Sequence, residues 1–213
     1  MNRILVVTAV EAEAQAVRGA DQTTVTVSAS GVGCAAAAAH TAVLLHSART
    51  EGRPYAAVLS AGIAGGFHGR VEVGGIAIGT KSIAADLGAD SPTGFIGLAE
   101  LGFGTGQYPA DQDLLTRLRS ALADAVAGPV LTVATVTGTA QGVAEILRRH
   151  PYAVAEAMEG FGVAEAAARH GTPFAEVRTI SNVVGPRDRD AWRIPQALAA
   201  LAEVGRAVGT LVG

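Results

Sequence analysis

The segment ILVVTAV (residues 4–10) runs directly into EAEAQAVRG (residues 11–19). The unbroken apolar run ILVV predicts a strand that is buried on both faces, as in a sheet covered by helices on each side. Glu11 and Glu13, followed by alanines, predict a helix that begins at Glu11 and ends at Gly19. A buried strand that passes into a helix is the first unit of an α/β fold.

The rest of the chain repeats this alternation of β-branched runs and alanine-rich helical stretches. We expect further strands at Thr23–Ala29, Ala56–Ala61, Val73–Ile83, Val130–Thr137, Ala153–Glu159 and Phe174–Ser181. We expect further helices at Cys34–Ala48, Asp111–Ala127, Gly162–Arg169 and Trp192–Val212, and a short helix that follows a Gly138/Gly142 turn and ends at Arg149. No linker, charge block or internal repeat divides the sequence, so we expect one α/β domain over residues 1–213.

The composition excludes two classes of protein. The 213 residues include 44 alanines and 27 glycines, only 16% are charged, and the formal net charge is −3. The chain is too apolar and too weakly charged for a disordered protein. It is also too acidic to hold nucleic acid on a basic patch, so we expect no nucleic-acid partner.

Signals for membranes and secretion are weak. The longest apolar stretch, Ala35–Leu45, is interrupted by His40 and falls short of the ~18 residues that a membrane span requires. Glu11 and Glu13 fall where a signal-peptide cleavage site would have to lie. The single cysteine, Cys34, excludes an internal disulfide and a cysteine-based zinc site. We expect a cytoplasmic protein without a membrane partner, with Cys34 as a small packed helix residue.

Ligands of α/β proteins gather outside the carboxyl ends of strands, and four predicted strand ends carry unusual residues. They are Thr8–Glu13, Ala61–Gly66, Ala157–Gly160 and Thr179–Gly185. Structural explanations exist, because acidic residues favour a helix N-terminus, glycines form strand-to-helix turns and Asn182 can cap a turn. Glu159 is harder to explain, since a carboxylate among apolar neighbours is either at the surface or buried and paired. The glycines match neither the dinucleotide nor the P-loop spacing, which disfavours a dinucleotide-dependent oxidoreductase.

Together these features resemble the nucleoside phosphorylase superfamily in residue type and in order. The chain is similar from end to end to the methylthioadenosine/S-adenosylhomocysteine nucleosidases of that superfamily. The matching stretches are TAVEAE (8–13), SGVG (30–33), AGIAGG (61–66), VGGI (73–76), AME (157–159) and RTISN (178–182). Within the superfamily it most resembles the futalosine hydrolases, which release hypoxanthine from futalosine in menaquinone biosynthesis. The resemblance implies a three-layer α/β/α fold with a central mixed, twisted and partly barrel-like sheet, and neither cofactor nor metal.

The same resemblance implies roles for individual residues. Cleavage of a purine N-glycosidic bond builds positive charge on the ribose and needs a deprotonated water on the opposite side of the sugar. Glu13 matches the family's general base, and Glu159 matches the glutamate that binds the ribose hydroxyls near that charge. The positions that match residues lining the nucleoside are Val10, Ala64, Gly65, Val136, Thr137, Met158 and Trp192. For Trp192, a tryptophan packed in the core of the last helix is the alternative.

Asn182 departs from the adenine-specific nucleosidases, which have aspartate at this position. A 6-oxopurine such as hypoxanthine presents an acceptor at position 6, and an asparagine amide supplies the donor that meets it. Because an unpaired buried acceptor is costly, Asn182 favours hypoxanthine over adenine. We therefore count Asn182 among the catalytic residues, while the group that protonates or hydrogen-bonds N7 of the purine stays open.

A second departure favours water over phosphate as the nucleophile. Phosphate needs cationic partners, and phosphorylases of the superfamily carry an arginine just before the glycine turn, where this chain reads AAVLS (56–60). Arg187 and Arg189 are candidates for holding the carboxylate of the futalosine side chain, although a solvated mixed-charge loop explains them as well. The alternatives are an adenosine-type nucleosidase, a 6-oxopurine phosphorylase and a non-catalytic nucleoside-binding protein.

Residues 84–110 are rich in glycine and show little periodicity. Long loops of this kind in compact domains are usually functional or mobile. Members of the family are commonly dimers in which a loop of the neighbour completes the active site. The resemblance therefore implies a homo-oligomer, and residues 84–110 are the candidate for its contact.

Overall fold

The computed structural model describes residues 3–18 and 24–211. Its strands are β1 (Arg3–Thr8), β2 (Val25–Ala29), β3 (Tyr55–Gly66), β4 (Ile76–Ala84), β5 (Gly88–Ala89), β6 (Ile96–Gly97), β7 (Gln107–Pro109), β8 (Val126–Thr132), β9 (Ala155–Ala157) and β10 (Phe174–Val183). Its helices are α1 (Glu11–Val17), α2 (Cys34–Thr50), α3 (Gln112–Ala121), α4 (Ala140–Arg149), α5 (Gly160–His170) and α6 (Ile194–Thr210). The expected helix end at Gly19, strand start at Thr23 and helix end at Val212 lie outside the described residues.

The central sheet is mixed and partly closed. Its strand order is β10-β4-β8-β9-β3-β1-β2, and β10 also pairs with β3. That extra pairing joins β10, β4, β8, β9 and β3 into a ring, from which β1 and β2 extend. β3 is parallel to β1 and β10 but antiparallel to β9. The predicted mixed, partly barrel-like sheet is therefore confirmed.

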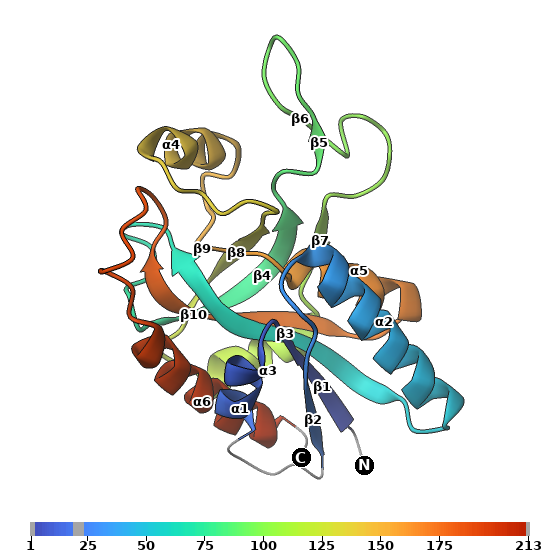
Figure 1. Ribbon diagram of the computed structural model, residues 1–213. Coiled ribbons are helices and arrows are strands. Elements are labelled where there is room, and N and C mark those ends of the chain that lie inside the picture. The colour runs from blue at the N-terminus through green and yellow to red at the C-terminus, as the bar shows by residue number, and fades with distance from the viewer. Residues whose placement is uncertain (1–2, 19–23, 212–213) are drawn as a thin grey trace.

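Helices cover both faces of the sheet, which gives the predicted three layers (Figure 1). α1, α3 and α6 pack on one face, and α2 and α5 pack against each other on the opposite face. The contact between α2 and α5 is very close: a methyl group at Gly162 would lie only 2.1 Å from the carbonyl oxygen of Cys34. Glycine at position 162 therefore allows the two helices to pack this closely. Cys34 is half-buried as the first residue of α2, which confirms its place in a helix.

β1 confirms the prediction of a strand buried on both faces. Ile4 and Val6 belong to the buried cluster beneath α1, α3 and α6. Leu5 and Val7 belong to the cluster beneath α2 and α5. Each buried side chain of this size contributes ~1.5–3 kcal/mol to folding relative to an exposed one. Because the side chains of β1 pack alternately against the two helix layers, β1 lies in the sheet between them.

The glycine cluster after the third predicted strand is not a turn. We expected the strand to end at Ala61, but β3 continues to Gly66. β10 pairs along this extension, with Ile180 opposite Ala64 and Asn182 opposite Gly65. The strand continues because the backbone hydrogen bonds of its glycines are satisfied by neighbouring strands on both sides.

Two further boundaries were predicted wrongly. The helix expected over Asp111–Ala127 ends at Ala121, and β8 occupies Val126–Thr132 instead of the expected Val130–Thr137. Pairing with β4 decides this, because Val126 and Ala127 lie opposite Ala77 and Ile78. Trp192 precedes the last helix, which begins at Ile194 with a proline in its first turn.

The stretch 84–110 is less irregular than its sequence indicates. It contains the short antiparallel pair β5–β6, and β7 pairs with β4. The β5–β6 segment projects from the body of the molecule at the top of Figure 1. Within residues 3–18 and 24–211, no helix is both long and apolar enough to cross a membrane.

Candidate active site

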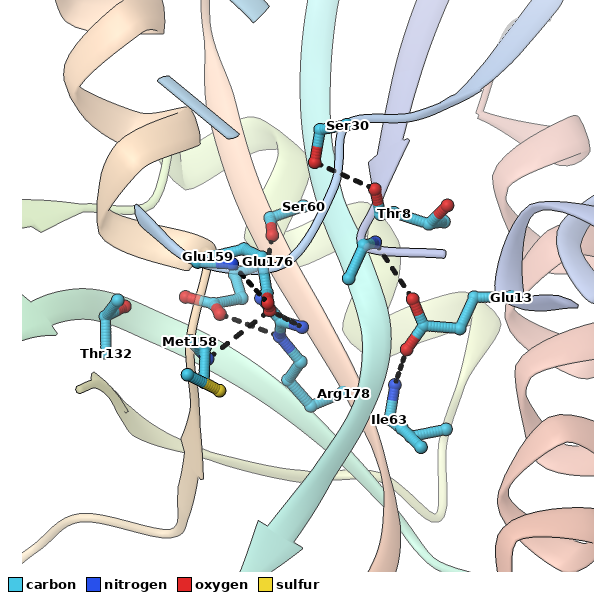
Figure 2. A network of polar contacts seen from close by, with 12 residues as sticks. Thr8, Glu13, Ser30, Ser60, Ile63, Thr132, Met158, Glu159, Glu176 and Arg178 are labelled. Carbon is cyan, nitrogen blue, oxygen red and sulfur yellow. Dashed lines mark hydrogen bonds and ion pairs between the residues drawn. The ribbon is translucent and has the colours of Figure 1, made fainter. Parts of the chain in front are cut away.

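Glu13 is buried and held by three backbone N–H groups. It lies in the first turn of α1 and is only 3% exposed. Its Oε2 accepts from the N–H groups of Ala9 (2.9 Å) and Val10 (3.1 Å), and its Oε1 accepts from the N–H of Ile63 on β3 (2.9 Å; Figure 2). Glu11, by contrast, is exposed and pairs with Arg18. A preference for helix N-termini explains Glu11, whereas Glu13 also bridges α1 to β3.

Gly62 makes room for this carboxylate. A Cβ atom there would lie 2.8 Å from Oε1 of Glu13 and 3.1 Å from Nη1 of Arg178. Both distances are shorter than ordinary van der Waals contacts. Glu13 and Arg178 therefore converge beside a residue that has no side chain, which is the physical reason for a glycine at this position of β3.

Glu159 is the second buried carboxylate, and it lies at the N-terminus of α5. Its Oε1 accepts from the N–H of Gly33 (3.2 Å), and its Oε2 accepts from the N–H of Met158 (3.3 Å). Gly33 has a φ of +99°, a conformation that favours glycine and turns its N–H toward Glu159 at the start of α2. The SGVG segment thus holds Glu159 in place, and the alternative of a surface carboxylate is wrong.

Arg178 joins two buried carboxylates, Glu159 and Glu176, as Figure 2 shows. It is 1% exposed on β10, and its guanidinium donates to Oε1 of Glu176 (2.9 Å), Oε2 of Glu159 (3.2 Å) and Oγ of Ser60 (2.9 Å). We call Glu13, Glu159, Glu176, Arg178 and Ser60 the carboxylate cluster. Sequence reasoning gave no role to Arg178 or Glu176, although two charges two residues apart in the apolar strand FAEVRTIS were a usable signal.

The carboxylates of the cluster surround a single cation. Desolvation alone would lower the pKa of Arg178, but Glu176, Glu159 and Glu13 together raise it above its ordinary value. The guanidinium is therefore charged under all ordinary conditions. Burial raises the pKa of Glu176 above its ordinary value, and the charge and hydrogen bond of Arg178 oppose that rise.

A cavity of about 260 Å³ opens near the carboxyl ends of β3 and β10. We call it the Asn182 cavity. The residues that line it are Gly65, Val73, Val136, Thr137, Gly138, Glu156, Asn182, Val183, Val184, Gly185, Pro186, Arg187, Asp188, Ala191 and Trp192. The structure thus brings together five of the residues predicted to meet the substrate: Gly65, Val136, Thr137, Asn182 and Trp192.

Asn182 is half-buried, and its amide is oriented by neighbours. Its Oδ1 accepts from Oγ of Ser181 (2.7 Å), and its Nδ2 donates to the carbonyl oxygen of Val183 (3.0 Å). Trp192 lies before α6, with the guanidinium of Arg187 5.2 Å and that of Arg189 5.7 Å from its ring centre. Because Trp192 lines the cavity and precedes α6, the alternative that it packs in the core of the last helix is wrong.

Two other predicted residues, Val10 and Met158, lie at the carboxylate cluster through their backbones and do not line the cavity. The N–H of Val10 donates to Glu13, and the N–H of Met158 donates to Glu159. Ala64 belongs to neither set, because it does not line the cavity and its carbonyl oxygen accepts from Oγ of Ser181 (3.3 Å). Apart from Ala64, the predicted residues therefore divide into a carboxylate group and a cavity group.

Glu156 is a cavity residue that sequence reasoning did not single out. It is 4% exposed on β9, and both of its oxygens are held by Thr137. Burial raises the pKa of Glu156 above its ordinary value, and the bonds from Thr137 oppose only part of that rise. Its charge inside the otherwise apolar run AVAEAM was the available signal. The described part of the chain contains no group of three or more His, Cys, Asp or Glu residues that could hold a metal ion.

A family model described as "Phosphorylase superfamily" matches residues 6–211. The chain belongs to the phosphorylase superfamily. It is 52% identical to the futalosine hydrolase of Streptomyces coelicolor over 185 residues, which cover 86% of this chain and 76% of the relative. It is 47% identical to the futalosine hydrolase of Acidothermus cellulolyticus over 74% of this chain and 66% of the relative.

Among solved structures of this superfamily, native futalosine hydrolase of Helicobacter pylori superposes with a TM-score of 0.83. The two chains are 15% identical, and the match covers 99% of this chain and 98% of the other, so it establishes the fold. The resemblance drawn from the sequence motifs, to the superfamily and within it to the futalosine hydrolases, is confirmed.

Proposed function

We propose that the protein hydrolyses the N-glycosidic bond of futalosine, releasing hypoxanthine and dehypoxanthine futalosine in menaquinone biosynthesis. The observation that carries the proposal is the 52% identity to a futalosine hydrolase over 86% of the chain. The site supports it independently, because it combines a buried carboxylate pair with a cavity that contains the Asn182 amide.

The two parts of the site are spaced along the same strands. Ile63, at the carboxylate cluster, and Gly65, in the cavity, are two residues apart on β3. Arg178 and Asn182 are four residues apart on β10. At about 3.3 Å per residue these separations are ~7–13 Å. A nucleoside can therefore place its sugar beside the carboxylates while its base lies in the cavity.

Within this arrangement Glu13 acts as the general base. Its carboxylate is fixed by three N–H groups, so it is preorganised to take a proton from a water that attacks the anomeric carbon. Glu159 binds the ribose hydroxyls, and its negative charge stabilises the oxocarbenium-like transition state. Asn182 donates to the 6-oxo group of the leaving hypoxanthine, and the indole of Trp192 covers the base.

The charge balance of the cluster favours hydrolysis over phosphorolysis. Binding of a phosphate nucleophile requires cations with free donors. Arg178 is the cation of the carboxylate cluster, and its guanidinium already donates to Glu176, Glu159 and Ser60. A phosphate at this place would face three carboxylates, whereas a neutral water would not be repelled.

Arg187 is the better placed of the two arginines for the carboxylate of the futalosine side chain. Arg187 lines the Asn182 cavity, and both guanidinium groups lie over the ring of Trp192. Its side chain is exposed, so it can follow a flexible substrate tail without breaking a buried contact. Replacement by alanine would raise KM for futalosine more than for inosine, which lacks that carboxylate.

We also propose that residues 1–213 act as one domain of a cytoplasmic homo-oligomer. The projecting β5–β6 segment is the candidate contact (Figure 1). Leu87, just before β5, and Phe103, which follows β6 in the chain, are 42% and 77% exposed, and an oligomer contact would cover them. The free thiol of Cys34 is compatible with a reducing compartment.

A base-release assay tests the proposed function. Futalosine, inosine and methylthioadenosine are each incubated with the protein, with and without phosphate, and the free base is quantified by chromatography. We expect futalosine to turn over at the same rate without phosphate, and methylthioadenosine to react poorly. A preference for methylthioadenosine would overturn the assignment of Asn182, and a strict need for phosphate would overturn hydrolysis.

A further inference from the structure

Glu176 is a fully buried carboxylate to which the proposed mechanism gives no role. It is 0% exposed and lies on β10, two residues before Arg178, so the two side chains point to the same face of the sheet. Its neighbours in the sheet are Ser60 of β3 and Gly79 of β4. Desolvation makes a buried carboxylate costly, so its presence in an apolar strand calls for an explanation.

Two glycines make room for the Glu176 side chain. A Cβ atom at Gly160, the first residue of α5, would lie 2.1 Å from Oε1 of Glu176. A Cβ atom at Gly79 would lie 3.1 Å from Cβ of Glu176. The carboxylate therefore lies against the first residue of α5, which is next in the chain to Glu159. The dipole of the helix favours negative charge at this end.

The contacts of Glu176 point to an electrostatic role. Its Oε1 accepts from Nε of Arg178 (2.9 Å). No group in the described part of the chain lies within hydrogen-bond distance of Oε2, although Ser82 favours the ionised form. A carboxylate that only completed a hydrogen-bond network would have both oxygens satisfied. The main partner of Glu176 is therefore the charge of Arg178.

Arg178 is placed between two carboxylates. Its Nε donates to Glu176, and its Nη1 donates to Oε2 of Glu159 (3.2 Å). Alone with Glu159, the guanidinium would neutralise the negative charge that the proposed mechanism needs near the ribose. Two ionised carboxylates around one cation leave a negative charge in excess. Arg178 can then hold Glu159 in position without cancelling its field.

We propose that Glu176 is a positioning residue that offsets the charge of Arg178, so that Glu159 keeps its attraction for the cationic ribose of the transition state. This inference rests on the proposed function and extends it to a side chain that does not touch the substrate. The attraction grows only as positive charge develops, because the sugar of a bound nucleoside is uncharged. Loss of the Glu176 charge therefore lowers kcat and leaves KM nearly unchanged.

Glu176→Gln and Glu176→Asp separate charge from shape. Glutamine keeps the shape and an acceptor oxygen for Arg178 but removes the charge, whereas aspartate keeps the charge and shortens the side chain. We expect kcat for futalosine to fall about 10- to 100-fold in Glu176→Gln, as when groups behind the ligands of a metal site are removed, and to fall less in Glu176→Asp. Glu145→Gln is the matched control, because the exposed Glu145 also pairs with arginine, and it should leave kcat unchanged.

A purely structural role for Glu176 predicts the opposite order. Glutamine, which fits the space better, would then be more active than aspartate, and the losses would appear in KM as well as in kcat. That order would overturn the proposal, and so would wild-type kcat in Glu176→Gln, since the charge of Glu176 would then have no effect.

Calorimetry tests the field of the carboxylate cluster without turnover. The ligands are a phenyl iminoribitol, whose ring nitrogen carries a proton, and the phenyl C-riboside, whose ring oxygen is uncharged. We expect the wild-type protein and Glu176→Asp to bind the cationic ligand at least about 10-fold more tightly than the neutral one. Glu176→Gln should lose most of this preference.

The inference is overturned if Glu176→Gln keeps the wild-type preference, or if the wild-type protein or Glu176→Asp shows none. The last two comparisons decide the matter even if circular dichroism shows that Glu176→Gln does not fold. If the wild-type protein does not hydrolyse futalosine, the proposed function fails, but the ratio of the two affinities still decides the role of Glu176.

Discussion

Nη1 of Arg178 lies 3.2 Å from Oε2 of Glu159, and both side chains are almost completely buried. The same guanidinium donates to Glu176 and Ser60 (Figure 2). A single cation therefore holds the Glu159 carboxylate in position. Buried ion pairs contribute little net stability, but they become very costly when one partner is removed. The contact between Arg178 and Glu159 therefore matters most for geometry, because it fixes the position of the Glu159 carboxylate at the start of α5.

Replacing Arg178 by leucine should destabilise the protein strongly. The substitution leaves Glu176 and Glu159 without their cation, and a broken buried pair costs ~3–5 kcal/mol. Chemical denaturation measures the free energy of unfolding. Arg169→Leu is the control, because Arg169 pairs with Glu165 at the surface and should cost no more than ~1 kcal/mol. Equal effects of the two substitutions would contradict the importance of the buried pair.

Glu13→Gln should abolish turnover with little loss of binding. Glutamine keeps the shape of the side chain but cannot take a proton from water, so we expect kcat to fall by ~10²- to 10⁴-fold. Stopped assays measure kcat, and calorimetry with hypoxanthine measures binding. Glu11→Gln is the control, because Glu11 is a neighbouring but exposed carboxylate. A fully active Glu13→Gln protein would support a non-catalytic nucleoside-binding protein or a different base.

Gly62→Ala should impair activity more than stability. The added methyl group would lie 2.8 Å from Oε1 of Glu13, so the carboxylate must move or lose its bond to Ile63. A misplacement of this size reduces kcat by ~10²-fold when the displaced group is the general base. Gly97→Ala is the control, since its Cβ would meet no atom within 4 Å. Wild-type kcat in Gly62→Ala would show that the position of Glu13 is not critical.

Asn182→Asp should shift the base preference toward adenine. An aspartate cannot donate to O6 when ionised, but it can accept from a 6-amino group. We expect kcat/KM for futalosine to fall about 10- to 100-fold and the value for its adenine counterpart to rise relative to it. The measurement is the ratio of the two kcat/KM values. An unchanged ratio would mean that Asn182 does not contact position 6 of the base.

Local sequence patterns predicted the elements better than their ends. The apolar run in β1 and the alanine-rich sequence of α2 are local features of the chain, so both elements were expected correctly. The extension of β3 through Gly66 and the early end of α3 depend on partners distant in sequence, β10 and β4. Glycine and alanine are poor strand formers, so the local sequence does not indicate pairing that depends on distant strands.

In the site, too, residues marked by local sequence were predicted, and residues that depend on distant partners were not. Glu13 and Glu159 follow strands, and Asn182 is the residue before the last of β10; all three were found because ligands gather near strand ends. Arg178 and Glu156 lie inside strands, and their meaning depends on which groups the fold places opposite them. A buried charge within a strand was visible in the sequence, but its partners were not.

The most direct test of the central claim is the hydrolysis of futalosine in water enriched in heavy oxygen, without phosphate, with both products analysed by mass spectrometry. The account predicts equal amounts of hypoxanthine and dehypoxanthine futalosine, with the heavy oxygen on the anomeric carbon of the sugar product. Absence of heavy oxygen from that carbon, or failure to release hypoxanthine from futalosine, would contradict it.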